Sequence, residues 1–176
     1  MPEDEDRRAA FERLFEANHR AVRAYVRRRA PGAVEDVVAD TFLVAWRRLD
    51  TIGDDPLPWL LGVARRTLAN HFRAERRRGD LALRIERATV ADEPPWEPPA
   101  TMSRELAAAV ASLSAAEREA LLLVAWEELE PRRAARAAGC SPAAFRVRLH
   151  RARRRVAAAL PERPQDGSRM IAEEAP

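Results

Sequence analysis

Two arginine-rich stretches are the residues of this sequence best suited to chemistry, and that chemistry is the binding of phosphates and bases. Residues 58–78 hold six arginines and one acid, and residues 142–160 hold six arginines and no acid. The guanidinium group is a planar fork of donors that matches phosphate oxygens and the edge of guanine. Residues 58–78 also interleave aromatic side chains with these cations, which suits a single strand whose bases must stack.

The placement of the charges is more informative than their sum. All 31 basic residues are arginine, a bias that a G+C-rich genome also produces, and the net charge is only +3. The acids gather at the N-terminus, between residues 34 and 49, and in a Pro-rich stretch at residues 91–100. The small net charge is therefore the sum of two strongly basic helices and three acidic segments, and we expect the acidic segments to have other partners.

Other classes of function lack the residues that they need. The single cysteine, Cys140, excludes an internal disulfide and a cysteine-cluster metal site. The three histidines form no zinc motif at helical spacing, and there is no glycine-rich phosphate loop. No apolar run approaches the roughly 18 residues of a membrane span, and the acidic N-terminus is unlike a signal peptide. We expect a cytoplasmic chain, monomeric when free, with no catalytic site, no metal and no cofactor.

An all-α fold must position these side chains, because apolar residues recur at three- and four-residue spacing and no stretch alternates with period two. We expect helices over residues 7–29, 34–49, 58–78, 103–113, 114–128, 131–138 and 142–160. A Pro-rich linker over residues 80–102 separates a domain at 1–79 from a second small helical domain at 103–160. We expect a flexible tail over residues 161–176.

The C-terminal domain has the pattern of a helix-turn-helix. Gly139 suits a left-handed turn, Ser141 suits an N-cap and Pro142 suits the first helical turn. The helix behind this turn carries six arginines, so it can enter the major groove with its N-terminal half on the bases. A surface helix whose arginines are merely hydrated would explain the charges, but it would not explain the turn residues that precede the helix.

Three motifs, in order, resemble bacterial RNA polymerase sigma factors, and most closely the extracytoplasmic-function (ECF) subfamily. Residues 34–46 (VEDVVADTFLVAW) resemble the helix that binds core polymerase. Residues 59–73 (WLLGVARRTLANHFR) resemble the helix that melts the promoter and reads its −10 element. Residues 139–153 (GCSPAAFRVRLHRAR) resemble the helix that reads the −35 element. The resemblance covers residues 10–78 and 103–160 and implies a non-enzymatic factor that recruits core RNA polymerase to specific promoters and initiates transcription.

The resemblance also implies roles for individual residues. Core-polymerase binding falls on Asp36, Val37, Asp40, Thr41, Phe42 and Trp46. Capture of a flipped −10 base, whose unstacking exposes its edge, falls on the loop Thr51, Ile52, Gly53, Asp54 and Asp55. The other −10 contacts fall on Trp59, Arg65, Arg66, Thr67, Asn70 and Arg73. The −35 contacts fall on Ser141, Arg146, Val147, Arg148, His150 and Arg151. An anti-sigma protein is a candidate partner beside core polymerase and promoter DNA.

Several positions depart from the family pattern. Ala39 stands where the polymerase-binding helix usually has glutamine, which affects one polymerase contact. Arg66 and Asn70 stand in place of asparagine and aspartate, so we expect an altered −10 preference. Ala144 and Val147 stand in place of threonine and serine, and Val147 can offer only apolar contact, for instance to a thymine methyl.

Two other functions stay open at this point. A helix-turn-helix regulator without polymerase would form a dimer on palindromic sites, and the helix at residues 34–49 argues against it. A degenerate sigma-like adaptor would titrate a partner, and the departures at Ala39, Ala144 and Val147 are compatible with it. Transcription with purified core polymerase separates both functions from a sigma factor.

Overall fold

The structure is a computed structural model that describes residues 2–82 and 98–160. Seven α-helices follow one another in these two ranges, and no strand occurs in them. They are α1 (Pro2–Arg27), α2 (Val34–Arg47), α3 (Pro56–Ala82), α4 (Arg104–Ala111), α5 (Ala115–Ala125), α6 (Pro131–Ala138) and α7 (Pro142–Ala159). Two single-turn 3-10 helices, η1 (Pro31–Ala33) and η2 (Leu49–Thr51), lie on either side of α2. The predicted all-helical fold is confirmed.

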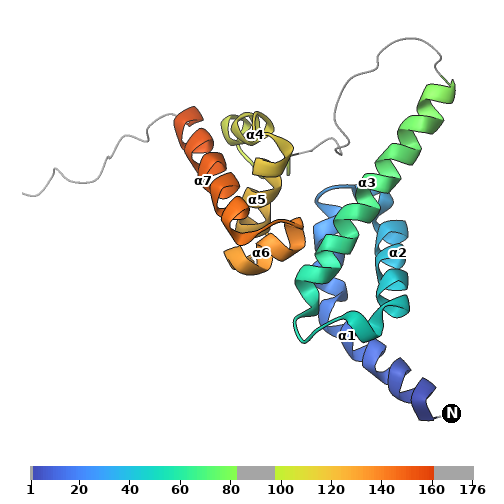
Figure 1. The fold of residues 1–176 in the computed structure, drawn as a ribbon. Helices are drawn as coiled ribbons and strands as arrows, with labels where there is room; N and C mark the ends of the chain where they lie inside the picture. Colours follow the sequence, from blue (N-terminus) through green and yellow to red (C-terminus); the bar gives the residue numbers. More distant parts are fainter. Residues whose placement is uncertain (1, 83–97, 161–176) are drawn as a thin grey trace, which may run out of the picture.

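The first three helices pack side by side into an N-terminal group (Figure 1). The apolar stripes of α1, α2 and α3 face one another, as their helical spacing predicts. Glu35 and Asp36 occupy the first turn of α2, where the helix dipole stabilises acids. The almost wholly buried residues of this group are Val22, Tyr25, Val26, Val37, Ala45, Leu60, Leu61, Ala64 and Leu68.

The ends of some helices differ from those expected. The N-terminal acids at residues 3–6 extend α1 to Pro2, because negative charge is favourable in a first turn. The third helix starts at Pro56 and continues to Ala82, three residues into the predicted linker, because a lone Gly79 among helix-forming residues does not stop it. Most of the predicted linker and the tail, at residues 83–97 and 161–176, lie outside the described residues.

Side-chain and glycine caps mark the helix ends of the C-terminal group, and those at Gly139 and Ser141 are as predicted. The Ser114 hydroxyl and the Glu117 carboxylate form a capping box at the start of α5. Gly139 ends α6 with a φ of 65°, in the left-handed region. The Ser141 hydroxyl then accepts a hydrogen bond of 3.2 Å from the Ala144 backbone N–H and starts α7. Phe145 is completely buried on the inner face of α7, so the helix-turn-helix is well anchored.

The two groups pack on each other, mainly through α3 and α6 (Figure 1). Buried residues of α5, α6 and α7 belong to the same apolar cluster as those of α1, α2 and α3. At the closest approach, a Cβ atom added to Gly62 would lie 3.3 Å from the Ala137 carbonyl oxygen. A glycine at this position therefore allows the backbone of α6 to come close to α3.

Glu117→Gln tests the anchoring of α5 to α7. The Glu117 carboxylate accepts hydrogen bonds from the Ser114 hydroxyl at 2.8 Å and from Arg155 at 3.0 Å. The Ser114 hydrogen bonds and the charge of Arg155 lower the pKa of Glu117. A lowered pKa means that this stabilisation is complete at neutral pH and is lost as the pH falls through that pKa.

We therefore expect Glu117→Gln to lower Tm by a few degrees at neutral pH, with the gap to the unmodified chain closing in acid. Circular dichroism melts over a pH series measure this difference. Glu16→Gln, at an exposed position in the middle of α1, is the control and leaves Tm unchanged. A gap that stays constant with pH would contradict the assignment.

Candidate functional site

The predicted polymerase-binding residues divide into exposed and buried sets along α2. Asp36 and Asp40 are exposed on its outer face, and Trp46 is half-buried. The remaining residues, Val37, Thr41 and Phe42, are at most 4% exposed and pack into the N-terminal group. The Thr41 hydroxyl is itself satisfied by donating a hydrogen bond of 2.7 Å to the Val37 carbonyl oxygen. The buried residues therefore anchor α2 to the N-terminal group, and Asp36 and Asp40 are the residues that a partner can contact.

Leu43 is the apolar residue of α2 that points outward. Its exposure is 45%, and the other large exposed hydrophobics in the described ranges are Phe15 and Val147. Burying such a side chain against a partner removes apolar surface from water, which favours association. Leu43 is absent from the predicted contact residues, although it lies within the motif at residues 34–46 that resembles the polymerase-binding helix.

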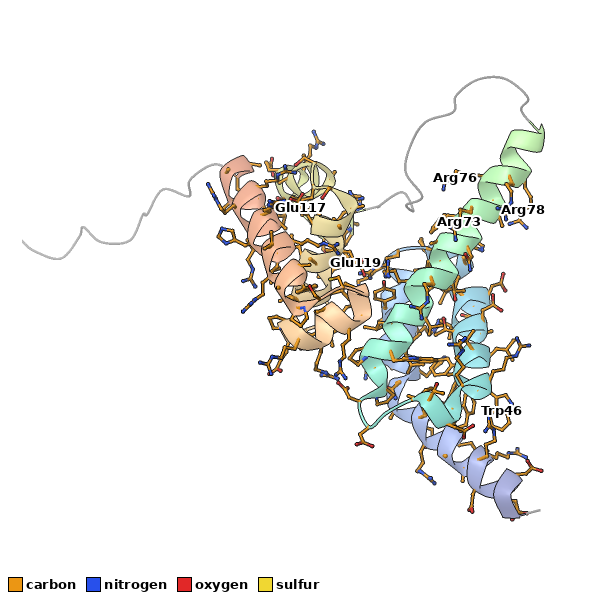
Figure 2. The ribbon with its side chains drawn as sticks, in the orientation of Figure 1. Trp46, Arg73, Arg76, Arg78, Glu117 and Glu119 are labelled. Carbon is orange, nitrogen blue, oxygen red and sulfur yellow. The ribbon has the colours of Figure 1, made fainter. Side chains whose placement is uncertain are left out.

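An aromatic cluster with one arginine covers the C-terminal end of α2. The rings of Phe11 and Trp46 meet edge to face, with centroids 5.3 Å apart, and the Arg7 guanidinium lies 5.3 Å from the Trp46 ring centroid. Arg7 also donates to the Trp46 carbonyl oxygen and to the Asp50 carboxylate, both at 2.8 Å. Figure 2 shows Trp46 at this end of α2. Arg7 thereby ties α1 to η2, next to the predicted base-capturing loop.

The predicted −10 loop is largely open to solvent. Thr51, Gly53 and Asp54 are exposed, whereas Ile52 packs partly against the core. The Thr51 hydroxyl donates a hydrogen bond of 2.8 Å to the Arg48 carbonyl oxygen and shapes the turn. The packing of Ile52 and the hydrogen bond of Thr51 thus fix the position of the loop, and the groups that the loop exposes to solvent are small or acidic.

The basic residues of α3 continue this surface. Arg66, Asn70 and Arg73 are exposed, while Trp59 and Thr67 are half-buried. The Asn70 side-chain oxygen accepts a hydrogen bond of 2.5 Å from Arg73. Figure 2 shows Arg73, Arg76 and Arg78 on the turns of α3 that project beyond α1 and α2. A strand laid along this helix would meet cations over several turns.

Partial desolvation and the like charges of Arg65 and Arg48 lower the pKa of Arg66. In such a cluster, each cation disfavours the charged form of its neighbours. A bound anion such as a phosphate stabilises the charged forms. Arg48 is a candidate that the sequence interpretation missed. It precedes the predicted loop by three residues, but only the fold brings its charge near Arg66.

Two of the predicted −10 residues are engaged by the C-terminal group instead. Arg133 donates two hydrogen bonds to the Asp55 carboxylate, at 2.6 and 3.0 Å, and Arg136 pairs with the same carboxylate. The hydrogen bond from Arg133 is the largest cause that lowers the pKa of Asp55. Arg65 lies against the turn between α6 and α7. Its Nη2 is so close to Gly139 that a Cβ atom added there would lie 3.2 Å from it.

A buried ionic network forms the other end of the contact between the groups. Arg29 donates to Glu119 at 3.1 and 3.3 Å and to Glu127 at 3.1 Å, and Arg28 pairs with Glu127. The Tyr25 hydroxyl donates to Glu119 at 2.8 Å. Burial alone would lower the pKa of Arg29, but the groups Tyr25, Glu119 and Glu127 raise it above its usual value. Figure 2 shows Glu119 at the edge of α5 that faces α1 and α3.

The outer face of α7 carries the predicted −35 residues. Ser141, Val147 and Arg151 are exposed. Arg146 and His150 are exposed as well, and Arg148 is half-buried. Val147, at 50%, is the most exposed large hydrophobic residue described. The exposed −35 residues of α7 therefore point away from the buried Phe145, whereas Arg148, three residues after Phe145, lies nearer to its side.

The comparisons with known proteins match both groups. Residues 14–78 match the family model for sigma-70 region 2, and residues 103–156 match that for sigma-70 region 4. The chain is 35% identical over 141 residues to the ECF RNA polymerase sigma factor SigF of Caulobacter vibrioides, covering 77% of each chain. This chain belongs to the ECF sigma factors. Against the RNA polymerase sigma factor NccH of Alcaligenes xylosoxydans xylosoxydans, the identity is 33% over 135 residues, covering 72% of this sigma factor and 73% of NccH.

A longer relative and two solved structures agree with this membership. The sigma factor is 30% identical over 163 residues to BldN of Streptomyces coelicolor, and these span 61% of BldN. Its fold is similar to that of RpoE from Bartonella quintana, solved with the anti-sigma factor NepR (TM-score 0.57, 25% identity, 85% of this chain and 95% of RpoE). It is also similar to CnrH, solved with the cytosolic domain of CnrY (TM-score 0.58, 26% identity, 86% and 87%).

The described residues, 2–82 and 98–160, also bear on metal binding and membrane insertion. No group of three metal-ligating side chains comes together among them. None of their helices is long and apolar enough to cross a membrane. Cys140 is half-buried in the turn between α6 and α7.

Asp55→Asn tests the contact between the −10 loop and α6. The change removes the charge that holds Arg133 and Arg136, and partly exposed ion pairs each contribute about 0–1 kcal/mol. We expect a larger radius of gyration by small-angle X-ray scattering, with an unchanged circular dichroism spectrum. Asp54→Asn makes the same change at the exposed neighbour and leaves the radius unaltered. Equal radii for the two variants would show that Asp55 does not hold the groups together.

Proposed function

We propose that this sigma factor recruits core RNA polymerase to its promoters through α2, holds the melted −10 strand with the loop and α3, and reads the −35 duplex with α7. The observation that carries the proposal is the pairing, in one chain, of the outward face of α2 with the basic face of α7. A DNA-binding regulator would need only the second of these surfaces.

The N-terminal group would act on polymerase and on the opened strand. Asp36, Asp40 and Leu43 share the accessible side of α2, so a basic and apolar surface on polymerase would complement them. Arg66 and Arg73 would hold the strand by its phosphates, which carry no sequence information. The loop at residues 51–55 would take the flipped base and supply the specificity.

The C-terminal group would anchor the complex on duplex DNA. The N-terminal half of α7 would enter the major groove, with Arg146 and Arg151 reaching phosphates or guanine edges. Val147 would meet a base edge by apolar contact, which favours a thymine methyl. Reading of the duplex by this helix would fix where the N-terminal group meets the −10 element.

Binding both promoter elements requires the two groups to separate. The elements are centred about 25 base pairs apart, which is roughly 85 Å of B-form duplex at one turn per 34–36 Å. The two groups touch each other here through α3 and α6. The compact arrangement is therefore a state of the free chain, and promoter binding needs a more extended one.

The partners follow from the same surfaces. Catalysis would belong to the polymerase, and the sigma factor would have no enzymatic activity of its own. Since bacterial core polymerase works in the cytoplasm, the proposal places the sigma factor there. An anti-sigma protein is a further proposed partner, by analogy with RpoE, which was solved with the anti-sigma factor NepR.

Run-off transcription with purified core polymerase tests the proposal. We expect the unmodified chain to direct initiation from promoters of its own genome. Arg66→Ala should lower open-complex formation by about tenfold or more, since an exposed cation beside the melted strand is lost, and should leave core affinity unchanged. A chain that binds DNA as a dimer without core, or binds core without initiating, would refute the proposal and favour a regulator or an adaptor respectively.

A crossed pair of variants separates the two surfaces. Leu43→Asp places a charge in the proposed polymerase interface, and Val147→Asp places one on the DNA-facing side of α7. We expect Leu43→Asp to weaken core affinity by about tenfold or more, or about 1.4 kcal/mol, and to leave −35 duplex affinity unchanged. The opposite pattern is expected for Val147→Asp. Fluorescence anisotropy with labelled core or duplex measures both, and equal effects of both variants would show that the surfaces are misassigned.

A further inference from the structure

Arg28 and Arg29 belong to neither the predicted polymerase site nor the predicted DNA sites. They come at the C-terminal end of α1 and meet two carboxylates of the C-terminal group, Glu119 and Glu127. The side chain of Arg29 is 6% exposed and that of Arg28 is 26% exposed. The Nε of Arg28 is buried with no hydrogen-bond partner, so the acids satisfy this pair of arginines incompletely.

The C-terminal group covers a third arginine, Arg65, which is a predicted −10 residue. The Nε of Arg65, like that of Arg28, is buried without a hydrogen-bond partner. The charge of Arg65 also acts on the Tyr25 hydroxyl beside Arg29. We call Arg28, Arg29 and Arg65 the arginine surface. It borders Arg66 and Arg48, whose cations are accessible.

The occupants of the arginine surface have the chemistry of phosphate groups. Carboxylates and phosphates both accept two parallel hydrogen bonds from a guanidinium fork. A buried ion pair contributes little net stability, because desolvation of the charges offsets their attraction. Exchange of the carboxylates for phosphates would therefore cost little, whereas separation of the groups with no replacing anion leaves Arg28 and Arg29 to water alone.

We propose that Arg28, Arg29 and Arg65 bind the phosphate backbone of promoter DNA, and that Glu119 and Glu127 occupy this site in place of phosphates in the compact chain. The inference rests on the proposed function, since it extends the −10 surface onto α1. Free sigma factor then binds DNA weakly because its own acids compete, and any partner that separates the groups exposes the site.

Removal of the competing charges is the first test. Glu119→Gln with Glu127→Gln in the full chain should raise affinity for a labelled single-stranded oligodeoxynucleotide of mixed sequence by at least about fivefold. The promoter sequence is not needed, because phosphate contacts are independent of sequence. Glu105→Gln with Glu128→Gln changes the charge equally at exposed positions of the same group and is the control. Equal affinities for the two double variants would overturn the masking role of the acids.

Removal of the arginines in the unmasked variant is the second test. Adding Arg28→Gln should weaken binding and reduce the slope of log K against log salt by about 0.7, as expected for one lost phosphate contact on a single strand. Arg13→Gln, at an exposed position of the same helix, should change neither quantity beyond the general loss of one charge. Arg28 is used because it is the less buried arginine; Arg29→Gln is added where melting curves show a folded chain. Equal slopes for Arg28→Gln and Arg13→Gln would overturn the phosphate role.

These results are independent of the transcription assay. Oligonucleotide affinities that change as expected in a chain that directs no transcription would support the arginine surface and overturn only the proposed function. A chain that directs transcription, with affinities unmoved by the Glu119 and Glu127 changes, would overturn only the inference.

Discussion

The compact arrangement of this sigma factor depends on one buried cation, Arg29. Only 8% of the surface of Arg29 is exposed, and burial alone disfavours the charged form of its side chain. Glu119 and Glu127 from the other group compensate it, and the Tyr25 ring lies 3.6 Å from its guanidinium. Because a buried ion pair is costly when broken yet adds little net stability, it selects one way of docking more than it strengthens docking. The contacts of Arg29 thereby fix where the segment after α1 meets Glu119 of α5 and Glu127.

The rest of the interface lies beside this network. Helix α6 packs on α3, where Gly62 admits the Ala137 carbonyl oxygen. The same geometry brings Arg133 onto Asp55 and covers Arg65. Asp55 and Arg65, which are assigned to −10 binding, therefore have different contacts when the two groups are docked and when they are separated. A ligand that binds only the separated arrangement shifts this equilibrium by its differential affinity.

Local signals made much of the fold predictable from the sequence, whereas long-range contacts did not. The left-handed Gly139 and the Ser141 N-cap depend on residues close in sequence, and both occur where predicted. The pairing of Arg29 with Glu119 joins residues 90 positions apart, and no sequence pattern marks it. Likewise, helical spacing places Leu43 on a wide apolar arc, but only the packing of α2 shows that it faces outward while Phe42 is buried.

The absence of lysine gains a structural meaning from these contacts. A genome bias can account for the composition, yet Arg29 uses Nε, Nη1 and Nη2 to reach two carboxylates and the Tyr25 carbonyl oxygen. Arg133 likewise grips Asp55 with two donors of its fork. A lysine ammonium is a point charge and cannot match either planar arrangement. The fork that holds the compact state is therefore the same chemical group that suits phosphates, so a modest rearrangement can exchange one anion for the other.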